Sequence, residues 1–223
     1  MNKNILKIRL GVLDKSSTDS VLDKERQELL DKLCPYAKDY ILGGGTALAL
    51  QLNHRKSYDF DFFTSSQVPK NLLEKISNTI PIANVAVDSA DELTFFTKNK
   101  IKVTFLYYSF SYSFPIETLE NGLKVFGIKD IAIKKAYTIG RRGEYRDYFD
   151  LYTILKNNYM DLSELIRITK KIYGSVFDEK IFLTQLIYFE DLRNFDIIPT
   201  SLSKLPKPEE VKRFFENLIK NYV

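Results

Sequence analysis

LGGGTALALQLNHRKSYDFDFF, residues 42–63, is the stretch that decides the fold of this chain. Three glycines at 43–45 follow a short apolar run at residues 40–42, which predicts a buried strand that stops at the glycines. The glycine turn opens onto Thr46, a plausible helix N-cap, and the apolar residues after it predict a helix over residues 46–52. The bare backbone N–H groups of such a turn can bind a phosphate.

Asp59 and Asp61 stand in an alternating stretch, residues 58–63, that predicts a β-strand. Because side chains along a strand alternate between its faces, both carboxylates leave one face and Phe60 and Phe62 leave the other. Two neighbouring carboxylates repel each other unless a cation lies between them. Hard divalent cations such as Mg²⁺ suit such a pair. Metal carboxylates beside a phosphate-binding turn indicate phosphoryl or nucleotidyl transfer.

Nearby basic residues leave a structural alternative open for the two carboxylates. Arg55 or Lys56 could neutralise them without a metal, since charges in a half-buried stretch must be paired or ligated. His54 is the one histidine of the chain, and a lone imidazole is a poor metal site because metals usually take several N or S ligands. We expect His54 to form a hydrogen bond that fixes the turn before the carboxylate strand.

The composition of the 223-residue chain is ordinary for a globular protein, with 44% hydrophobic and 28% charged residues. The net charge of +4 permits an RNA or nucleotide partner without requiring one. A single cysteine, Cys34, excludes an internal disulfide, and the first ten residues lack a long apolar core. No apolar run is long enough to cross a membrane, so we expect a cytoplasmic protein with no membrane partner.

The pattern of elements predicts an α/β (α+β) fold, a small mixed sheet with helices followed by a C-terminal helical region. Strands are expected at residues 40–42, 58–63, 83–87, 93–97 and 101–107, and helices at residues 21–33, 46–52, 69–80, 130–139, 145–156, 162–173, 179–189 and 209–222. We expect residues 1–157 to form the first domain and residues 158–223 to form a helical region packed on it.

A basic block within residues 130–155 carries a second group of candidate residues. Lys135 and Arg142 are two helical turns apart, so they share a face if one helix reaches both, although Gly140 and Gly143 favour a break. The block suits a triphosphate or an RNA backbone. A solvated helix face with ordinary ion pairs is the alternative.

The helix predicted after these glycines has an expected apolar stripe of Tyr148, Leu151, Tyr152 and Leu155. Asp147, Asp150 and Ile154 are expected to point elsewhere. Arg146 is expected to pair with Asp150, one helical turn away.

Two separated motifs resemble the AbiEii/AbiGii nucleotidyltransferase-like toxin family. The first combines residues 44–50 with residues 54–63, and the second runs from Lys135 through Arg142 to Tyr152. The resemblance covers residues 40–155 well and implies a DNA polymerase β-like minimal nucleotidyltransferase fold. It also implies a toxin of an abortive-infection or toxin–antitoxin operon, silenced by a cognate antitoxin protein.

The resemblance also implies roles for individual residues. Asp59 and Asp61 resemble the Mg²⁺ ligands, and Lys135 and Asp147 complete the expected catalytic set, the lysine contacting nucleotide phosphate and Asp147 being the essential late carboxylate. The expected nucleotide-binding residues are Gly44, Gly45, Thr46, Arg55 and Arg142, with Asp150 in support.

The chain departs from the wider superfamily at a third metal carboxylate, which many members place on a later strand. The strand expected at residues 101–107 has no acid, so Asp88 or Glu92, or Asp147 in part, is left to replace it. The resemblance implies transfer of NMP from an NTP to an acceptor hydroxyl, at the 3′ end of tRNA, as related toxins do. A catalytically inactive nucleotide- or RNA-binding module, and transfer to a protein or small molecule, are the alternatives.

Overall fold

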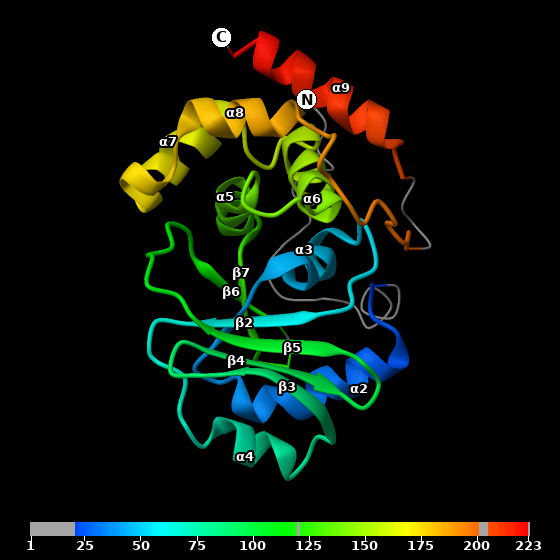
Figure 1. Ribbon diagram of the computed structural model, residues 1–223, viewed down its shortest axis with the longest axis vertical. Coiled ribbons are helices and arrows are strands. Elements are labelled where there is room, and N and C mark those ends of the chain that lie inside the picture. The colour runs from blue at the N-terminus through cyan, green and yellow to red at the C-terminus, as the bar shows by residue number, and fades with distance from the viewer. Residues whose placement is uncertain (1–20, 120, 201–204, 223) are drawn as a thin grey trace.

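The computed structural model describes residues 21–119, 121–200 and 205–222, and its centre is a mixed seven-stranded sheet (Figure 1). The strand order is β3-β4-β5-β2-β1-β7-β6. The strands are β1 (Ile41–Leu42), β2 (Phe60–Thr64), β3 (Ile82–Asp88), β4 (Glu92–Thr97), β5 (Lys102–Tyr107), β6 (Ile116–Thr118) and β7 (Lys124–Phe126). The α/β prediction and the mixed sheet are confirmed.

Strand β2, which carries Asp61, lies in the middle of this sheet. It runs parallel to β5 and antiparallel to β1, so both of its edges are hydrogen-bonded. Phe60 and Phe62 are fully buried on one face, where the Phe62 ring stacks on Phe105 with centroids 4.9 Å apart. Asp61 leaves the opposite face, beside Thr104 of β5. The alternation therefore places one face in the core and leaves the other for polar side chains.

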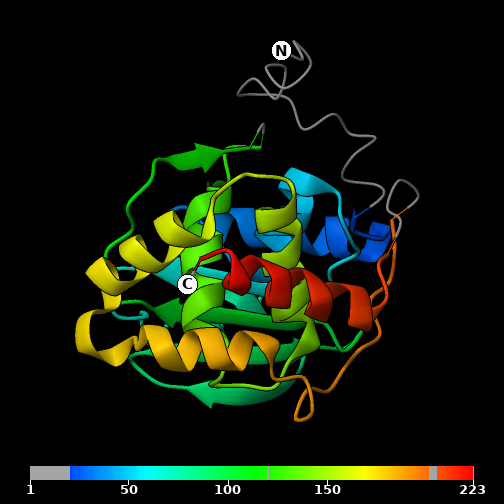
Figure 2. The same ribbon diagram turned by 90° about the horizontal axis from the view of Figure 1, so that it is seen from above.

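Helices cover both faces of the sheet (Figure 1). The α-helices are α2 (Lys24–Leu33), α3 (Gly44–Leu52), α4 (Leu72–Ser77), α5 (Ile128–Thr138), α6 (Tyr145–Lys156), α7 (Leu162–Tyr173), α8 (Glu179–Ile187) and α9 (Pro208–Lys220), with short 3₁₀ turns η1 (Cys34–Tyr36) and η2 (Gly174–Val176). Figure 1 shows α2 and α4 on one side and α3, α5 and α6 on the other. Seen from above, α7, α8 and α9 form a further layer over α5 and α6 (Figure 2).

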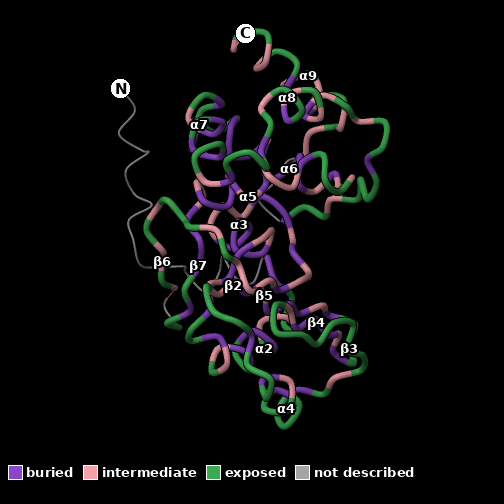
Figure 3. Tube along the Cα trace, turned by 60° about the vertical axis from the view of Figure 1, so that its left-hand side comes forward, coloured by how far each residue is buried: buried purple, intermediate pink, exposed green. Residues whose placement is uncertain are grey.

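Burial follows this layering. Figure 3 shows buried residues concentrated in the middle of the molecule, while β3 is exposed along most of its length. Apolar side chains of the C-terminal helices, Leu165, Leu186 and Phe215 among them, are fully buried against the layer below. The predicted C-terminal helical region is therefore confirmed, and it shares the core of the molecule.

Several predicted boundaries are wrong. Helix α3 begins at Gly44 with Gly43 as its N-cap, so Thr46 is not the cap. Strand β2 begins at Phe60, so Asp59 lies just before it. Strands β6 and β7 were not expected, because three-residue strands are too short to show a period of two.

Helices α2 and α4 are shorter than expected by three residues or more, and α8 and α9 by one or two. Helix α2 starts at Lys24, where the Asp23 side chain accepts a hydrogen bond from the Arg26 backbone N–H. Helix α4 covers only Leu72–Ser77 of the predicted residues 69–80. Within the described ranges, no helix combines the length and apolar character that crossing a membrane requires. The expectation about the first ten residues lies outside the described part of the chain.

Candidate active site

Gly44 brings the start of α3 into contact with the Asp61 carboxylate. The Gly43 backbone N–H donates to the Asp61 carbonyl at 2.8 Å, which joins the glycine turn to β2. Gly44 has a φ of +64°, and a Cβ there would lie 2.6 Å from Asp61 Oδ2. Only glycine fits both demands. The first N–H groups of α3, which have no partners inside the helix, therefore begin beside this carboxylate.

The two neighbouring glycines also make close contacts. A Cβ at Gly43 would lie 2.5 Å from Cε2 of Phe63, and one at Gly45 would lie 2.1 Å from Nη2 of Arg55. The turn therefore needs glycine for close packing as well as for its backbone conformation. Gly44 and Gly45 lie in one turn, as predicted.

Thr46 connects the helix start to the residues before β2. Its buried hydroxyl hydrogen-bonds to Oγ of Ser57 at 2.7 Å and donates to the backbone carbonyl of Asp59. Because these contacts occupy the hydroxyl, the side chain fixes the position of Asp59 and is not directed at a ligand.

The carboxylates of Asp59 and Asp61 form no ion pair with any cation among the described residues. Both are half-buried, and neither carboxylate has a hydrogen bond or ion pair within residues 21–119, 121–200 and 205–222. Burial raises the pKa of Asp61, the nearby Asp59 charge raises it further, and Lys102 opposes the rise. Such a pair is stabilised by an added cation. Two hard oxygen donors with open positions for phosphate oxygens and water fit Mg²⁺.

The third carboxylate is not found beside this pair. Thr104 occupies the position on β5 opposite Asp61, and its hydroxyl lies 3.1 Å from that of Thr94 on β4. Thr94 in turn donates to Glu92 at 2.6 Å, so Glu92 is held one strand beyond β5. Asp88 lies on the edge strand β3, further away still. Among the described residues no three His, Cys, Asp or Glu side chains form a group that could hold a metal.

Asp150 is the centre of a buried charged network behind the glycine turn. Its fully buried carboxylate accepts hydrogen bonds from Arg55 Nε at 2.7 Å and Arg55 Nη2 at 2.9 Å. Lys135 Nζ lies 2.6 Å from its second oxygen. Burial alone would raise the pKa of Asp150, but Arg55 and Lys135 hold it well below its ordinary value. The expected pairing of Asp150 with Arg146 is wrong, because Arg146 lies 3.7 Å from Glu144 instead.

Asp147 extends the network to Lys135 and Arg142. Lys135 Nζ donates to its Oδ1 at 2.6 Å, and Arg142 Nε donates to its Oδ2 at 2.7 Å. Burial would raise the pKa of Asp147, but Lys135 and Arg142 lower it. The interpretation of this block as a solvated face is therefore wrong for Lys135 and both aspartates. Ile154, expected off the apolar stripe together with them, is fully buried as well. Within the network around Asp147 and Asp150, Arg142 is the cation open to solvent, with its side chain 56% exposed.

His54 belongs to the same network. Its Nε2 lies 2.8 Å from Asp150 Oδ1, its ring stacks on Phe149, and its Nδ1 has no partner in the described structure. Burial lowers the pKa of His54, although Asp150 opposes the shift. The expected hydrogen bond of His54 is confirmed, and it joins the segment before β2 to α6. Sequence reasoning gave Asp150 only a supporting place. The sequence feature that could have indicated its burial is its place between the apolar residues Phe149 and Leu151, on the buried side of α6.

Comparisons with known proteins identify the family. Residues 28–124 match the family described as "Nucleotidyl transferase AbiEii toxin, Type IV TA system", a range that includes the glycine turn and both unpaired carboxylates. An uncharacterised protein of Aquifex aeolicus is 35% identical over 215 residues, covering 91% of this chain and 98% of the relative.

One solved structure supports the fold. A candidate nucleotidyltransferase from H. pylori superimposes with a TM-score of 0.57 at 18% identity, covering 93% of this chain and 95% of that one. JHP933 from Helicobacter pylori gives a TM-score of 0.49 at 17% identity, with 95% and 98% covered. The sequence matches lead to one assignment. The chain belongs to the AbiEii nucleotidyl transferase toxin family of type IV toxin–antitoxin systems and is a nucleotidyltransferase.

Proposed function

We propose that the chain transfers NMP from an NTP to an acceptor hydroxyl at the 3′ end of tRNA, with Asp59 and Asp61 holding Mg²⁺. The observation that carries this proposal is the pair of unneutralised carboxylates at the N-terminus of α3. Three nearby cations are already bound, Arg55 to Asp150, Arg142 to Asp147 and Lys135 to both aspartates. Lys102 opposes the pKa rise of Asp61 but forms no ion pair with it in the described structure, so the carboxylate pair is open to a cationic ligand.

The reaction forms one bond and breaks one. The acceptor oxygen bonds to the α-phosphorus, the bond from that phosphorus to the β-bridging oxygen breaks, and pyrophosphate leaves with the electron pair. The acceptor proton passes to water. Mg²⁺, when bound, neutralises charge on the phosphate oxygens.

The residues of the chain position the nucleotide. The free N–H groups at Gly44, Gly45 and Thr46 suit the phosphates, as helix N-termini do. The exposed Arg142 is the cation of the network that a triphosphate can reach. Lys135 is buried between two aspartates, so we assign it to holding Asp147 and Asp150 in place and not to direct phosphate contact.

Family membership implies an NTP as substrate and an antitoxin protein as partner. Both therefore form part of the proposal. The choice of tRNA rests on the resemblance to toxins that modify its 3′ end, together with the net charge of +4.

The test is incubation of the purified protein with each α-³²P-labelled NTP, Mg²⁺ and total tRNA. We expect wild type to label tRNA with one or more NTPs. In Asp61→Ala the rate of labelling should fall roughly 100-fold or more, because one metal ligand is removed. Asp91→Ala, an exposed acid in the turn between β3 and β4, is the matched control and should keep full activity. Equal labelling by wild type and Asp61→Ala would show that this mechanism is wrong.

One observation favours a second candidate, an inactive nucleotide- or RNA-binding module. The described residues contain no three-acid group at the carboxylate pair. This candidate predicts NTP binding with no pyrophosphate release at any Mg²⁺ concentration. Pyrophosphate release without label on tRNA would instead direct the search to protein or small-molecule acceptors.

A further inference from the structure

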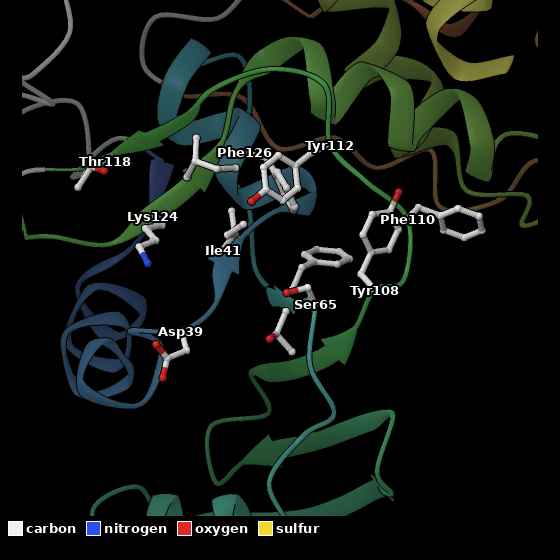
Figure 4. A pocket seen from close by; sticks show the side chains of 12 residues that line it. Asp39, Ile41, Ser65, Tyr108, Phe110, Tyr112, Thr118, Lys124 and Phe126 are labelled. Carbon is white, nitrogen blue, oxygen red and sulfur yellow. The ribbon is translucent and has the colours of Figure 1, made fainter. Parts of the chain in front are cut away.

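An aromatic pocket lies at the carboxyl-terminal end of β2 (Figure 4). Its volume is about 330 Å³, within the range of small-molecule sites. Rings from three separate segments line it, namely Phe63, Tyr108, Phe110, Tyr112 and Phe126. Tyr112 is 49% exposed, so part of its ring is open to a ligand. None of these aromatic residues has a role in the mechanism above.

The pocket lies close to the carboxylate pair, although neither Asp59 nor Asp61 lines it. Phe63 is two residues beyond Asp61 on the same strand, so both side chains leave the same face, with Cα atoms about 7 Å apart. The backbone of Gly43 packs against the Phe63 ring on this side. A molecule seated in the pocket therefore lies about one strand repeat, roughly 7 Å, along β2 from Asp61.

A second pocket lies beyond the opposite end of β2 and has a different chemistry. It measures about 280 Å³ and is lined by Arg55, Lys56 and Arg146, with Tyr58 and Asp196 beside them. Arg55 is bound to Asp150 and Arg146 lies 3.7 Å from Glu144, which leaves Lys56, unpaired among the described residues, to attract phosphate on this side. Asp59 and Asp61 thus lie between a basic pocket and an aromatic one.

This arrangement separates the two substrates. In phosphoryl-group transfer the attacking and leaving oxygens lie roughly in line through the phosphorus. If pyrophosphate departs toward the basic side, the acceptor hydroxyl must enter from the aromatic side. We propose that the aromatic pocket holds the 3′-terminal nucleobase of an RNA acceptor, an inference that rests on the proposed nucleotidyl transfer.

The rim of the pocket fits a nucleobase better than a purely apolar group. Thr64, Ser65 and Thr118 supply hydroxyls for the edge of a base, and Lys124 stands where a backbone phosphate can be met. The rings are also held in place from outside the lining. Lys134 Nζ lies 3.3 Å from the ring centroid of Tyr108 and 4.3 Å from that of Phe126. A preset group of rings loses little freedom when a base stacks on it.

The first experiment measures binding alone. A single-stranded RNA oligonucleotide with 2-aminopurine as its 3′-terminal base is titrated with wild type, and stacking is followed as quenching of the 2-aminopurine fluorescence. The chain has no Trp, so its own fluorescence interferes little. We expect quenching with wild type, and roughly 10-fold weaker binding with little quenching for Tyr112→Ala, since one stacking ring is lost.

Three further variants separate stacking from folding. Tyr112→Phe keeps the ring and should restore both binding and quenching. Ser65→Leu adds bulk without a ring to the exposed rim and should block the pocket without removing any native contact. Tyr188→Ala removes an equally exposed ring elsewhere and should behave as wild type. If Tyr112→Ala and Ser65→Leu quench the 2-aminopurine fluorescence as much as wild type does, the proposal is overturned.

Steady-state kinetics then identify which base occupies the pocket. We expect Tyr112→Ala to raise KM for the RNA acceptor roughly 10-fold and to leave KM for the NTP unchanged. A rise in KM for the NTP alone assigns the pocket to the incoming nucleotide and overturns the acceptor assignment. If wild type transfers no label at all, the proposed function fails, yet the fluorescence titration still decides whether the pocket binds a base.

Discussion

At the scale of single residues, the glycine turn illustrates how one atom can decide a site. Gly44 and Gly122 both have positive φ, +64° and +79°. A Cβ at Gly44 would lie 2.6 Å from the Asp61 carboxylate, whereas a Cβ at Gly122 would have no atom within 4 Å. The two positions therefore share backbone strain and differ in the contact with the candidate metal ligand.

This difference predicts the outcome of two alanine substitutions. Gly122→Ala should cost about 1 kcal/mol of unfolding free energy from backbone strain and leave nucleotidyl transfer unchanged. Gly44→Ala should cause the same backbone strain and also displace the Asp61 carboxylate, so the rate of nucleotidyl transfer should fall roughly 100-fold or more. Urea unfolding and the labelled-NTP assay measure the two effects. Equal activity in both variants would contradict the close contact with Asp61.

At the scale of elements, α5 and α6 are joined by charges that the core would otherwise exclude. Lys135 of α5 is buried between Asp147 and Asp150 of α6, while Arg142 and Arg55 each hold one of these aspartates from the other side. Burying ions is costly unless each is paired and hydrogen-bonded, and here each one is. The network sets the spacing of the two helices behind the glycine turn.

Two lysines on α5 provide a matched comparison. Lys135→Met should lower the unfolding free energy by about 2 kcal/mol or more, because two charged hydrogen bonds disappear while Arg55 and Arg142 still compensate the aspartates. Lys129→Met removes a pair with Glu164 whose side chains are 37% and 24% exposed, and should cost at most about 1 kcal/mol. Chemical denaturation measures both, and a larger loss in Lys129→Met would refute the importance of the buried network.

At the scale of the whole molecule, the charged network and the C-terminal helices connect the sheet region to the helices that follow it. Arg55 precedes β2, Asp150 lies 95 positions further along the chain on α6, and α7 and α9 pack on α5 and α6. Tyr148 of α6 also donates to the Gln185 carbonyl of α8 at 3.0 Å. We propose that residues 1–157 and 158–223 remain distinct in architecture but unfold together. Far-UV and near-UV circular dichroism should therefore report one coincident urea transition.

The same unfolding experiment, repeated at different pH, tests Asp150. Its folded pKa is well below 3.8, so its contribution is fully present above the pKa of the unfolded chain and is lost as pH falls through the folded pKa. Asp150→Asn should cost about 3–5 kcal/mol at pH 5, because Arg55 and Lys135 lose a buried partner charge. The difference in unfolding free energy between wild type and Asp150→Asn should narrow as pH falls below 3.8. A difference in unfolding free energy that stays constant down to strongly acid pH would contradict a stabilising role for these buried ion pairs.

The sequence predicted the parts of this protein that depend on local pattern. The alternation around Asp59 and Asp61 predicted the central strand, and the three glycines predicted the turn beside it. Helical periodicity predicted α6 and α7 with their observed bounds. These signals lie within a few residues of each other, so a single stretch of chain carries them.

Tertiary structure alone decided the roles of the charges and the rings. Only the fold brings Arg55 to Asp150 and buries Lys135, and only the fold gathers Phe63, Tyr108 and Tyr112 around one pocket. Burial also determines whether a charged residue is solvated or locked in a network, and burial comes from packing between distant segments. The sequence by itself determined the family, the strand and the carboxylate pair. The fold decided which cations are already bound to aspartates and which surface is left for the substrates, because those contacts join positions that are close only in space.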